Sequence, residues 1–223
     1  MLVAVSSYLK DAEAIYALSF KRVAAAVPDL AQCPPPIRRM LGRCIHAVAD
    51  PSIFKDFRYS DDVAEATRVA LRDGADILCD SRMLAAGISR QFLPAAGGGN
   101  ACVVMLDHPD TEATARRFAT TRSAAGVILH REQLKGAIVA IGNAPTALFA
   151  LLEGLAAGWH MPAVIFAFPL GFVGAHEAKS ALVKTHFGIP YMTLMGRRGG
   201  SGMAAAAINS VILAMHAPNK GAV

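Results

Sequence analysis

The sequence contains little charge. Only 17% of its 223 residues are charged, whereas 54% are hydrophobic. Intrinsic disorder requires low hydrophobicity and high net charge, and a long coiled coil requires far more charge, so both are excluded for most of the chain. A chain of this length can bury a core without disulfides or structural metals. We therefore expect a single domain over 1–223, with its core over about 11–215.

The chain also has few cysteines, and none of them are close together. Cys33, Cys44, Cys79 and Cys102 include no pair with the spacing of a zinc or redox motif. Scattered free thiols are typical of a reducing compartment. The amino-terminal segment lacks the basic region and long apolar run of a secretory signal. We therefore expect a cytoplasmic protein.

Several common catalytic motifs are absent as well. The sequence has no HExxH, no GxSxG, no Walker loop and no GxGxxG that opens a helix, and its histidines show no paired metal spacing. We therefore expect no metal site, and no motif here identifies a nucleotide cofactor. Basic residues outnumber acidic ones by 22 to 17, which gives a net charge of +5. This balance admits nucleic acid, a membrane surface or a polyanionic small molecule as partner, without choosing among them.

One apolar run imitates a membrane span. Residues 154–174 contain no Lys, Arg, Asp or Glu, and hydropathy alone would identify them as a transmembrane segment. However, Gly158, Pro162 and Pro169 interrupt the run. A buried parallel strand flanked by turns explains the pattern better, because such strands are continuous apolar runs. We therefore expect no membrane association.

Apolar strands alternate with amphipathic helices along the chain. The predicted strands are 75–79, 102–106, 137–141, 163–168 and 190–194. The predicted helices are 11–27, 37–49, 61–73, 146–157, 175–184 and 202–215, and a further helix is predicted to begin at 121–123. This alternation predicts an α/β fold with a mostly parallel five-stranded sheet covered on both faces, of flavodoxin-like or Rossmann-like type.

The loops that follow the predicted strands indicate where a ligand binds. In such sheets, ligands bind beyond the carboxyl ends of the strands. The loops expected there are 80–82, 107–109, 142–145, 169–174 and 196–202. Three of them are rich in glycine and lead into helices, whose amino-terminal amides favour anions, and the last adds Arg197 and Arg198. We expect this end of the sheet to bind an anion.

The predicted helix 37–49 has one apolar and one polar face. Ile37, Met40, Leu41, Cys44, Ile45 and Val48 recur at helical spacing and form the apolar stripe. His46 lies opposite this stripe, and Arg39, Arg43 and Asp50 fall on its outer face. Such a face is ordinarily a solvated surface. If a ligand covers it, a histidine there is a natural proton donor, and the arginines can anchor carboxylates.

Short motifs between Asp11 and Val211 follow one another in a characteristic order. They are AIY (14–16) with SF (19–20), RCIHA (43–47), ILCD (77–80), TRSAA (121–125), AIGNAPTAL (140–148), PLGFVGA (169–175) and GRRGGS (196–201). In this order and spacing they resemble the precorrin-8X methylmutases of corrin (vitamin B12) biosynthesis, including the cobalt-precorrin-8 branch. The resemblance covers nearly the whole chain.

The resemblance implies a flavodoxin-like three-layer sandwich and an isomerase that needs no cofactor. The family moves the methyl group on C-11 of precorrin-8X, or of cobalt-precorrin-8, to C-12, which gives hydrogenobyrinate or cobyrinate. His46 matches the catalytic histidine, whose implied role is to protonate or hydrogen-bond a ring nitrogen.

The resemblance also implies which residues bind the substrate. Ser19 and Arg43 match the family's substrate contacts, and Tyr16 and Arg122 match residues lining the same pocket. Ser89 stands where a pocket threonine is expected, so the hydroxyl is kept and a methyl group is lost.

The partners implied are a corrin-ring tetrapyrrole as substrate and product, a second copy in a homodimer that binds the substrate close to the subunit contact, and a corrin-amidating enzyme that receives the product.

Two other functions stay open from the residues alone. One is a flavodoxin-like enzyme that binds a nucleotide or phosphometabolite, which rests only on fold-level analogy. The other is a nucleic-acid-binding protein, which is disfavoured because Arg197 and Arg198 lie in a glycine loop rather than along a basic stripe with aromatics.

Overall fold

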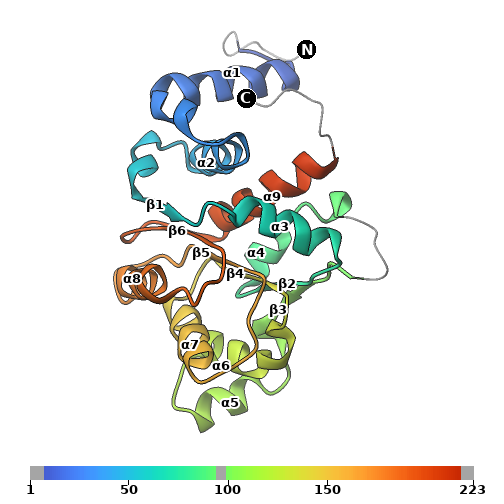
Figure 1. The fold of residues 1–223 in the computed structure, drawn as a ribbon, viewed down its shortest axis with the longest axis vertical. Coiled ribbons are helices and arrows are strands. Elements are labelled where there is room, and N and C mark those ends of the chain that lie inside the picture. The colour runs from blue at the N-terminus through green and yellow to red at the C-terminus, as the bar shows by residue number, and fades with distance from the viewer. Residues whose placement is uncertain (1–7, 94–98, 217–223) are drawn as a thin grey trace, which may run out of the picture.

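The computed structural model describes residues 8–93 and 99–216. Figure 1 shows its elements in chain order. The helices are α1 (Ala12–Ala26), α2 (Pro35–Val48), α3 (Val63–Arg72), α4 (Arg82–Gly87), α5 (Thr111–Arg117), α6 (Arg122–Leu129), α7 (Pro145–Ala156), α8 (Ala175–Thr185) and α9 (Ser201–His216). The strands are β1 (Phe57–Tyr59), β2 (Ile77–Cys79), β3 (Cys102–Val104), β4 (Ile138–Ile141), β5 (Val164–Ala167) and β6 (Tyr191–Leu194).

Within the described residues, the strands form one sheet of six, in the order β1-β6-β5-β4-β2-β3. The five predicted strands are all present, and all of them pair in parallel. The predicted number of five is wrong by one, because β1 adds an antiparallel edge beside β6. The three residues of β1 are too few for an alternating pattern to identify a strand, so its pairing with β6 defines it.

The order of the parallel strands is that of flavodoxin. Taken in chain order, they lie as second, first, third, fourth and fifth across the sheet. The order in which successive strands are added to the sheet therefore reverses between β2 and β4, and this switch point is where ligands ordinarily bind in such sheets. The flavodoxin-like prediction is confirmed over the Rossmann-like one.

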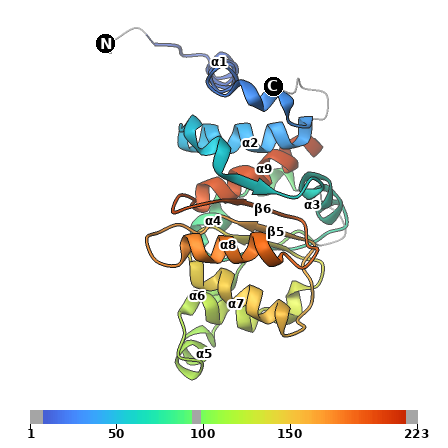
Figure 2. The same cartoon turned by 60° about the vertical axis from the view of Figure 1, so that its left-hand side comes forward.

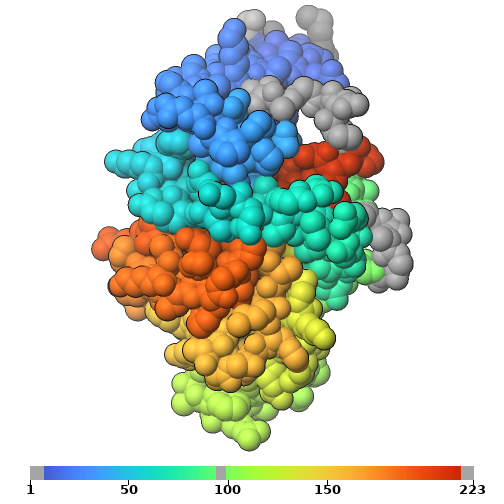
Figure 3. All heavy atoms as spheres, in the orientation of Figure 1, coloured from blue at the N-terminus to red at the C-terminus, as the bar shows by residue number. Residues whose placement is uncertain are grey.

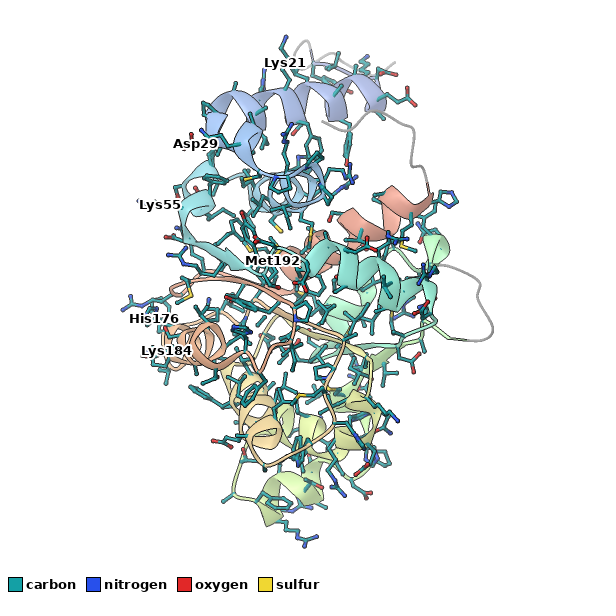
Figure 4. The ribbon with its side chains drawn as sticks, in the orientation of Figure 1. Lys21, Asp29, Lys55, His176, Lys184 and Met192 are labelled. Carbon is teal, nitrogen blue, oxygen red and sulfur yellow. The ribbon has the colours of Figure 1, made fainter. Side chains whose placement is uncertain are left out.

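Two hydrophobic cores lie on opposite faces of the sheet. Helices α3, α4 and α9 pack on one face and α2 packs on α9, and the buried side chains of this core include Met192 of β6 (Figure 4). Helices α6, α7 and α8 pack on the other face, and α5 contacts the outer side of α6. Figure 2 shows the sheet between these two groups of helices. The predicted three-layer arrangement is confirmed.

Helix α1 lies outside the three layers. It packs on α2 rather than on the sheet, and it forms one end of the molecule (Figures 1 and 3). Asp11 caps its amino terminus by accepting a hydrogen bond from the amide of Ala14. Phe20 is the buried residue of this helix. Most of its apolar surface, including Ile15 and Leu18, is exposed.

The apolar run 154–174 contains β5, as predicted. All residues of this strand are buried, and turns flank it on both sides. Among the described residues, no helix combines the length and the apolar character needed to cross a membrane. The helices α4 and α5 were not predicted, because six and seven residues are too few for a helical period to emerge from the sequence.

Candidate active site

Helix α2 presents His46 away from the core, as the periodicity predicts. The helix begins within a run of three prolines, and its first two residues, Pro35 and Pro36, occupy positions where a missing N–H costs nothing. The apolar stripe is buried from Ile37 to Ile45, and only Val48 at its end is exposed. His46 lies on the opposite face and is exposed in the single chain.

The ring of His46 is held in place by three side chains of α1. The Ser19 hydroxyl lies 2.8 Å from Nδ1 of His46, at hydrogen-bonding distance. The Phe20 ring stacks on the imidazole with a centroid distance of 5.0 Å and an interplanar angle of 22°. The Tyr16 ring meets it edge-on at 5.9 Å. These contacts fix the plane of the ring and occupy Nδ1, so Nε2 is the nitrogen left for a ligand.

Arg43 lies one turn before His46 on the same helix. Its guanidinium carbon lies 5.6 Å from the centroid of the Tyr16 ring and 5.8 Å from that of Phe20, within the range of a cation–π contact. Within the part of the chain that the structure describes, no carboxylate pairs with Arg43. Its charge is therefore available to an anionic ligand beside His46.

The segment that follows α2 connects this group of residues to the carboxyl edge of the sheet. The segment directly after α2 is tied to the loop that follows β6, through an ion pair of 2.7 Å between Asp50 and Arg198. The neighbouring loop after β5 exposes large apolar side chains at the same edge: Phe172 is 87% exposed and Val173 is 88% exposed. The edge thus offers both cationic and apolar surface.

The other two predicted substrate residues lie apart from His46 within one chain. Ser89 follows α4 on the same face of the sheet as α2, and its amide donates to Oδ1 of Asn209 on α9 at 2.8 Å. Arg122 is the first residue of α6, on the opposite face. It is exposed and lies 4.0 Å from Glu112. The structure therefore brings Tyr16, Ser19, Arg43 and His46 together, but it does not bring Ser89 or Arg122 to them.

The predicted anion-binding loops are largely occupied by the chain itself. At the switch point, the buried carboxylate of Asp80 accepts the amides of Gly142, Asn143 and Ala144 at 3.0, 2.8 and 2.9 Å. Burial raises the pKa of Asp80, and these hydrogen bonds oppose the rise. No amide of this set is left for an external anion.

The two arginines of the last glycine loop have different surroundings. Arg198 pairs with Asp50 and Asp56, so its charge is neutralised within the chain. Arg197 is exposed, and its guanidinium lies 5.4 Å from the centroid of the Phe172 ring. The prediction that both arginines attract an external anion therefore fails for Arg198, because its position beside two carboxylates cannot be read from loop composition.

Sequence reasoning gave no role to Phe20 or Asp80. Phe20 lies four residues after Tyr16 and so shares its face of α1, which is the signal that could have placed both rings against His46. Asp80 directly follows a buried apolar strand, where an acidic side chain without an internal partner is rare. An acidic residue at such a position could have indicated that its carboxylate has partners inside the protein.

Together, the flavodoxin strand order and an imidazole held beside an arginine that pairs with no described carboxylate define an α/β protein with a candidate acid–base site between helices α1 and α2. Comparisons with known proteins agree on one family. The family profile described as precorrin-8X methylmutase matches residues 14–214. A precorrin-8X methylmutase from Pseudomonas aeruginosa is 46% identical over 204 residues, which cover 92% of this chain and 96% of the relative.

More distant relatives extend the same match. A cobalt-precorrin-8 methylmutase from Salmonella typhimurium is 34% identical and covers 92% of this chain and 96% of its own length. The crystal structure of a precorrin-8X methylmutase from Thermus thermophilus superposes with a TM-score of 0.77 at 36% identity, covering 90% of this chain and 96% of that one. The chain belongs to the precorrin-8X methylmutase family.

Proposed function

We propose that this protein is an isomerase that moves the C-11 methyl group of precorrin-8X to C-12, and that His46 is its catalytic residue. The observation that carries the proposal is the outward imidazole, held by Ser19 on a chain that matches the family from residue 14 to residue 214. The domain responsible is the whole folded unit, over about 11–215.

The Ser19 contact gives His46 a defined chemical role. When the Ser19 hydroxyl donates to Nδ1, the proton of the neutral ring resides on Nε2, which then donates to a ring nitrogen of the macrocycle. This hydrogen bond strengthens as electron density moves toward that nitrogen during methyl migration. An interaction stronger in the transition state than in the ground state is the kind that accelerates a reaction. No cofactor takes part in this step.

The surroundings of His46 suit a large apolar ring that bears carboxylates. Arg43 supplies a cation beside the imidazole, and Tyr16 supplies an aromatic wall. Only the resemblance supports a substrate-binding role for Ser89 and Arg122, since within one chain neither lies beside His46. The rival function, binding of a nucleotide or phosphometabolite, loses its main support, because the carboxylate of Asp80 holds the switch-point amides that a phosphate would need.

A second copy of the chain completes the site in this proposal. His46 is exposed in the single chain, whereas proton donation to a ring nitrogen is favoured where water is excluded. Helix α1 carries Ile15 and Leu18 with 46% and 40% exposure, directly beside the residues that hold His46. A homodimer formed through α1 would bury the exposed apolar side chains of this helix and would also shield His46 from water.

We also propose that the product leaves slowly and passes to a corrin-amidating enzyme in the cytoplasm. Contacts between arginines and several carboxylates, added to apolar contact with the ring, favour tight product binding. The cysteines at 33, 44, 79 and 102 are free thiols, which suits a reducing compartment. Gel filtration after mixing with product is expected to give a coloured protein peak. A colourless peak would contradict retention of the product.

Turnover of purified substrates tests the proposed activity. The protein is incubated in parallel with precorrin-8X and with its cobalt form, and the absorbance of the conjugated product ring is followed. We expect faster conversion of the metal-free substrate, because identity is higher to the Pseudomonas relative named for precorrin-8X than to the Salmonella relative named for the cobalt form. Absence of conversion with both substrates would refute the activity.

A further inference from the structure

Arg198 joins both ends of the segment that follows the histidine helix. Its Nη1 donates to Oδ2 of Asp50 at 2.7 Å and to Oγ of Ser52 at 2.7 Å, and its Nη2 donates to Oδ2 of Asp56 at 2.6 Å. Asp50 immediately precedes the short 3₁₀ segment Pro51–Asp56, and Asp56 ends it. One guanidinium therefore holds the start and the end of this segment at once, which the single ammonium of a lysine cannot do with the same geometry.

The backbone around Arg198 is also fixed by contacts with α8 and with the end of β5. The buried ammonium of Lys179 on α8 donates to the Arg198 carbonyl at 2.7 Å. The next residue, Gly199, passes so close to the carbonyl of Phe168 that a Cβ there would collide with backbone. The Gly200 amide donates to the same carbonyl at 2.8 Å. The position of the Arg198 Cα is thus fixed by α8 and by the end of β5.

The segment that Arg198 holds is continuous with the last turn of α2. Ala49 ends the helix in the left-handed conformation, with φ of 53°, and its amide points to the carbonyl of His46 at 3.4 Å. A non-glycine residue in this conformation is strained and persists only where its neighbours hold it. Asp50, the next residue, is held by Arg198. The anchor thus lies within one helical turn of His46.

We propose that Arg198 is a positioning residue, which fixes the last turn of α2 through Asp50 and Asp56 and thereby keeps the His46 ring against Ser19 and at the correct distance from the substrate. This inference rests on the proposed function and extends it. Arg198 does not contact the substrate in this account, because its three hydrogen bonds are made within the chain.

The substitution Arg198→Gln tests the proposal. We expect kcat to fall about tenfold or more, with a smaller change in KM, because a displacement on the order of 1 Å in a catalytic group has effects of this size. We expect no further fall when Arg198→Gln is added to His46→Ala, because the arginine acts through that histidine. An equal fall in both backgrounds, or an unchanged kcat, would overturn the proposal.

A spectroscopic measurement keeps the test independent of turnover. Nitrogen-15 NMR of the histidine rings reports the hydrogen bond at Nδ1 of His46 directly, whether or not the protein isomerises precorrin-8X. We expect Arg198→Gln to shift the His46 signals. If the wild type converts no substrate, the proposed function fails, whereas unchanged His46 signals refute the positioning role alone.

Three further variants serve as controls. Asp50→Asn keeps the side-chain oxygen that accepts the Ser52 amide at 2.9 Å but loses the charge that pairs with Arg198. We expect it to lower kcat and shift the His46 signals as Arg198→Gln does, so it tests the same contact if Arg198→Gln does not fold. Arg198→Lys is expected to restore part of kcat. Arg72→Gln removes an exposed arginine that pairs with Asp73 at 3.0 Å on α3, and it is expected to leave kcat and the His46 signals unchanged. Wild-type kcat and His46 signals in Asp50→Asn would also overturn the proposal.

Discussion

The catalytic role proposed for His46 depends on one hydroxyl group, that of Ser19. It engages one ring nitrogen at 2.8 Å, while the Phe20 ring sets the plane of the imidazole. Because the ring is held at Nδ1, Nε2 points in a defined direction. This reduces the entropic cost of orienting the imidazole during the reaction. The chemistry therefore depends on a contact between α1 and α2 as much as on the histidine.

Replacing Ser19 by alanine should reduce turnover without unfolding the protein. We expect Ser19→Ala to lower kcat about tenfold, because the ring loses its partner at Nδ1 and samples other orientations. Steady-state kinetics with precorrin-8X measure the effect. Ser180→Ala is a matched control, since the Ser180 hydroxyl lies 3.4 Å from Nε2 of His176, on α8 and away from the site. A wild-type kcat in Ser19→Ala would contradict the role of the hydroxyl.

Asp80 is a residue on which stability depends. Its carboxylate accepts three backbone amides, and asparagine would offer one acceptor oxygen and turn an NH₂ group toward N–H donors. We expect Asp80→Asn to lower the free energy of unfolding by about 2–4 kcal/mol, measured by urea denaturation. The exposed carboxylate of Asp73, replaced in Asp73→Asn, is the control and should change stability by less than about 0.5 kcal/mol. A similarly small effect of Asp80→Asn would contradict this assignment.

Among the elements, α8 carries the buried ammonium group of Lys179, and the free-energy cost of burying this charge depends on pH. Burial lowers the pKa of Lys179 to about 8. Between this value and the ordinary lysine pKa, the unfolded chain binds a proton that the folded chain lacks, so the free energy of unfolding rises with pH in this window. We expect Lys179→Met to remove that rise. Urea denaturation of both proteins from about pH 7 to 10.5 measures it, and a difference between them that does not vary with pH would contradict the prediction.

The sequence predicts elements well where a period is long enough to be read. The apolar stripe of α2 placed His46 outward, and continuous apolar runs located all five parallel strands. The pattern fails for β1, α4 and α5, which are too short to show a period and which form because neighbouring elements hold them.

The contacts of the site were less predictable than its elements. Ser19 and His46 are 27 residues apart, so no local pattern places them in contact, and only the resemblance to a family associated them. The pairing of Arg198 with Asp50 spans 148 residues and reversed the expectation that this arginine binds a ligand. Long-range side-chain pairs depend on how the layers pack, and composition does not encode that.

At the scale of the whole molecule, the exposed apolar surface of α1 predicts a dimer. Light scattering should give twice the chain mass of 23.4 kDa for the wild type. A double substitution, Ile15→Glu with Leu18→Glu, should give a monomer that is still folded but has lost activity, because two charges on an apolar contact are costly to bury. Ala156→Glu, on the exposed side of α7, should remain dimeric. A wild-type monomer with full activity would contradict the role of the second copy.

The most direct test of the whole account compares the wild type with His46→Ala in the conversion of precorrin-8X. The substitution removes the imidazole but leaves the buried stripe of α2 intact, so folding should be unaffected. A positioned general acid contributes about 10²–10⁴-fold, and we expect kcat to fall by a factor in this range, as followed by the absorbance of the conjugated product. Undiminished conversion by His46→Ala would contradict the central claim that this imidazole assists the methyl migration.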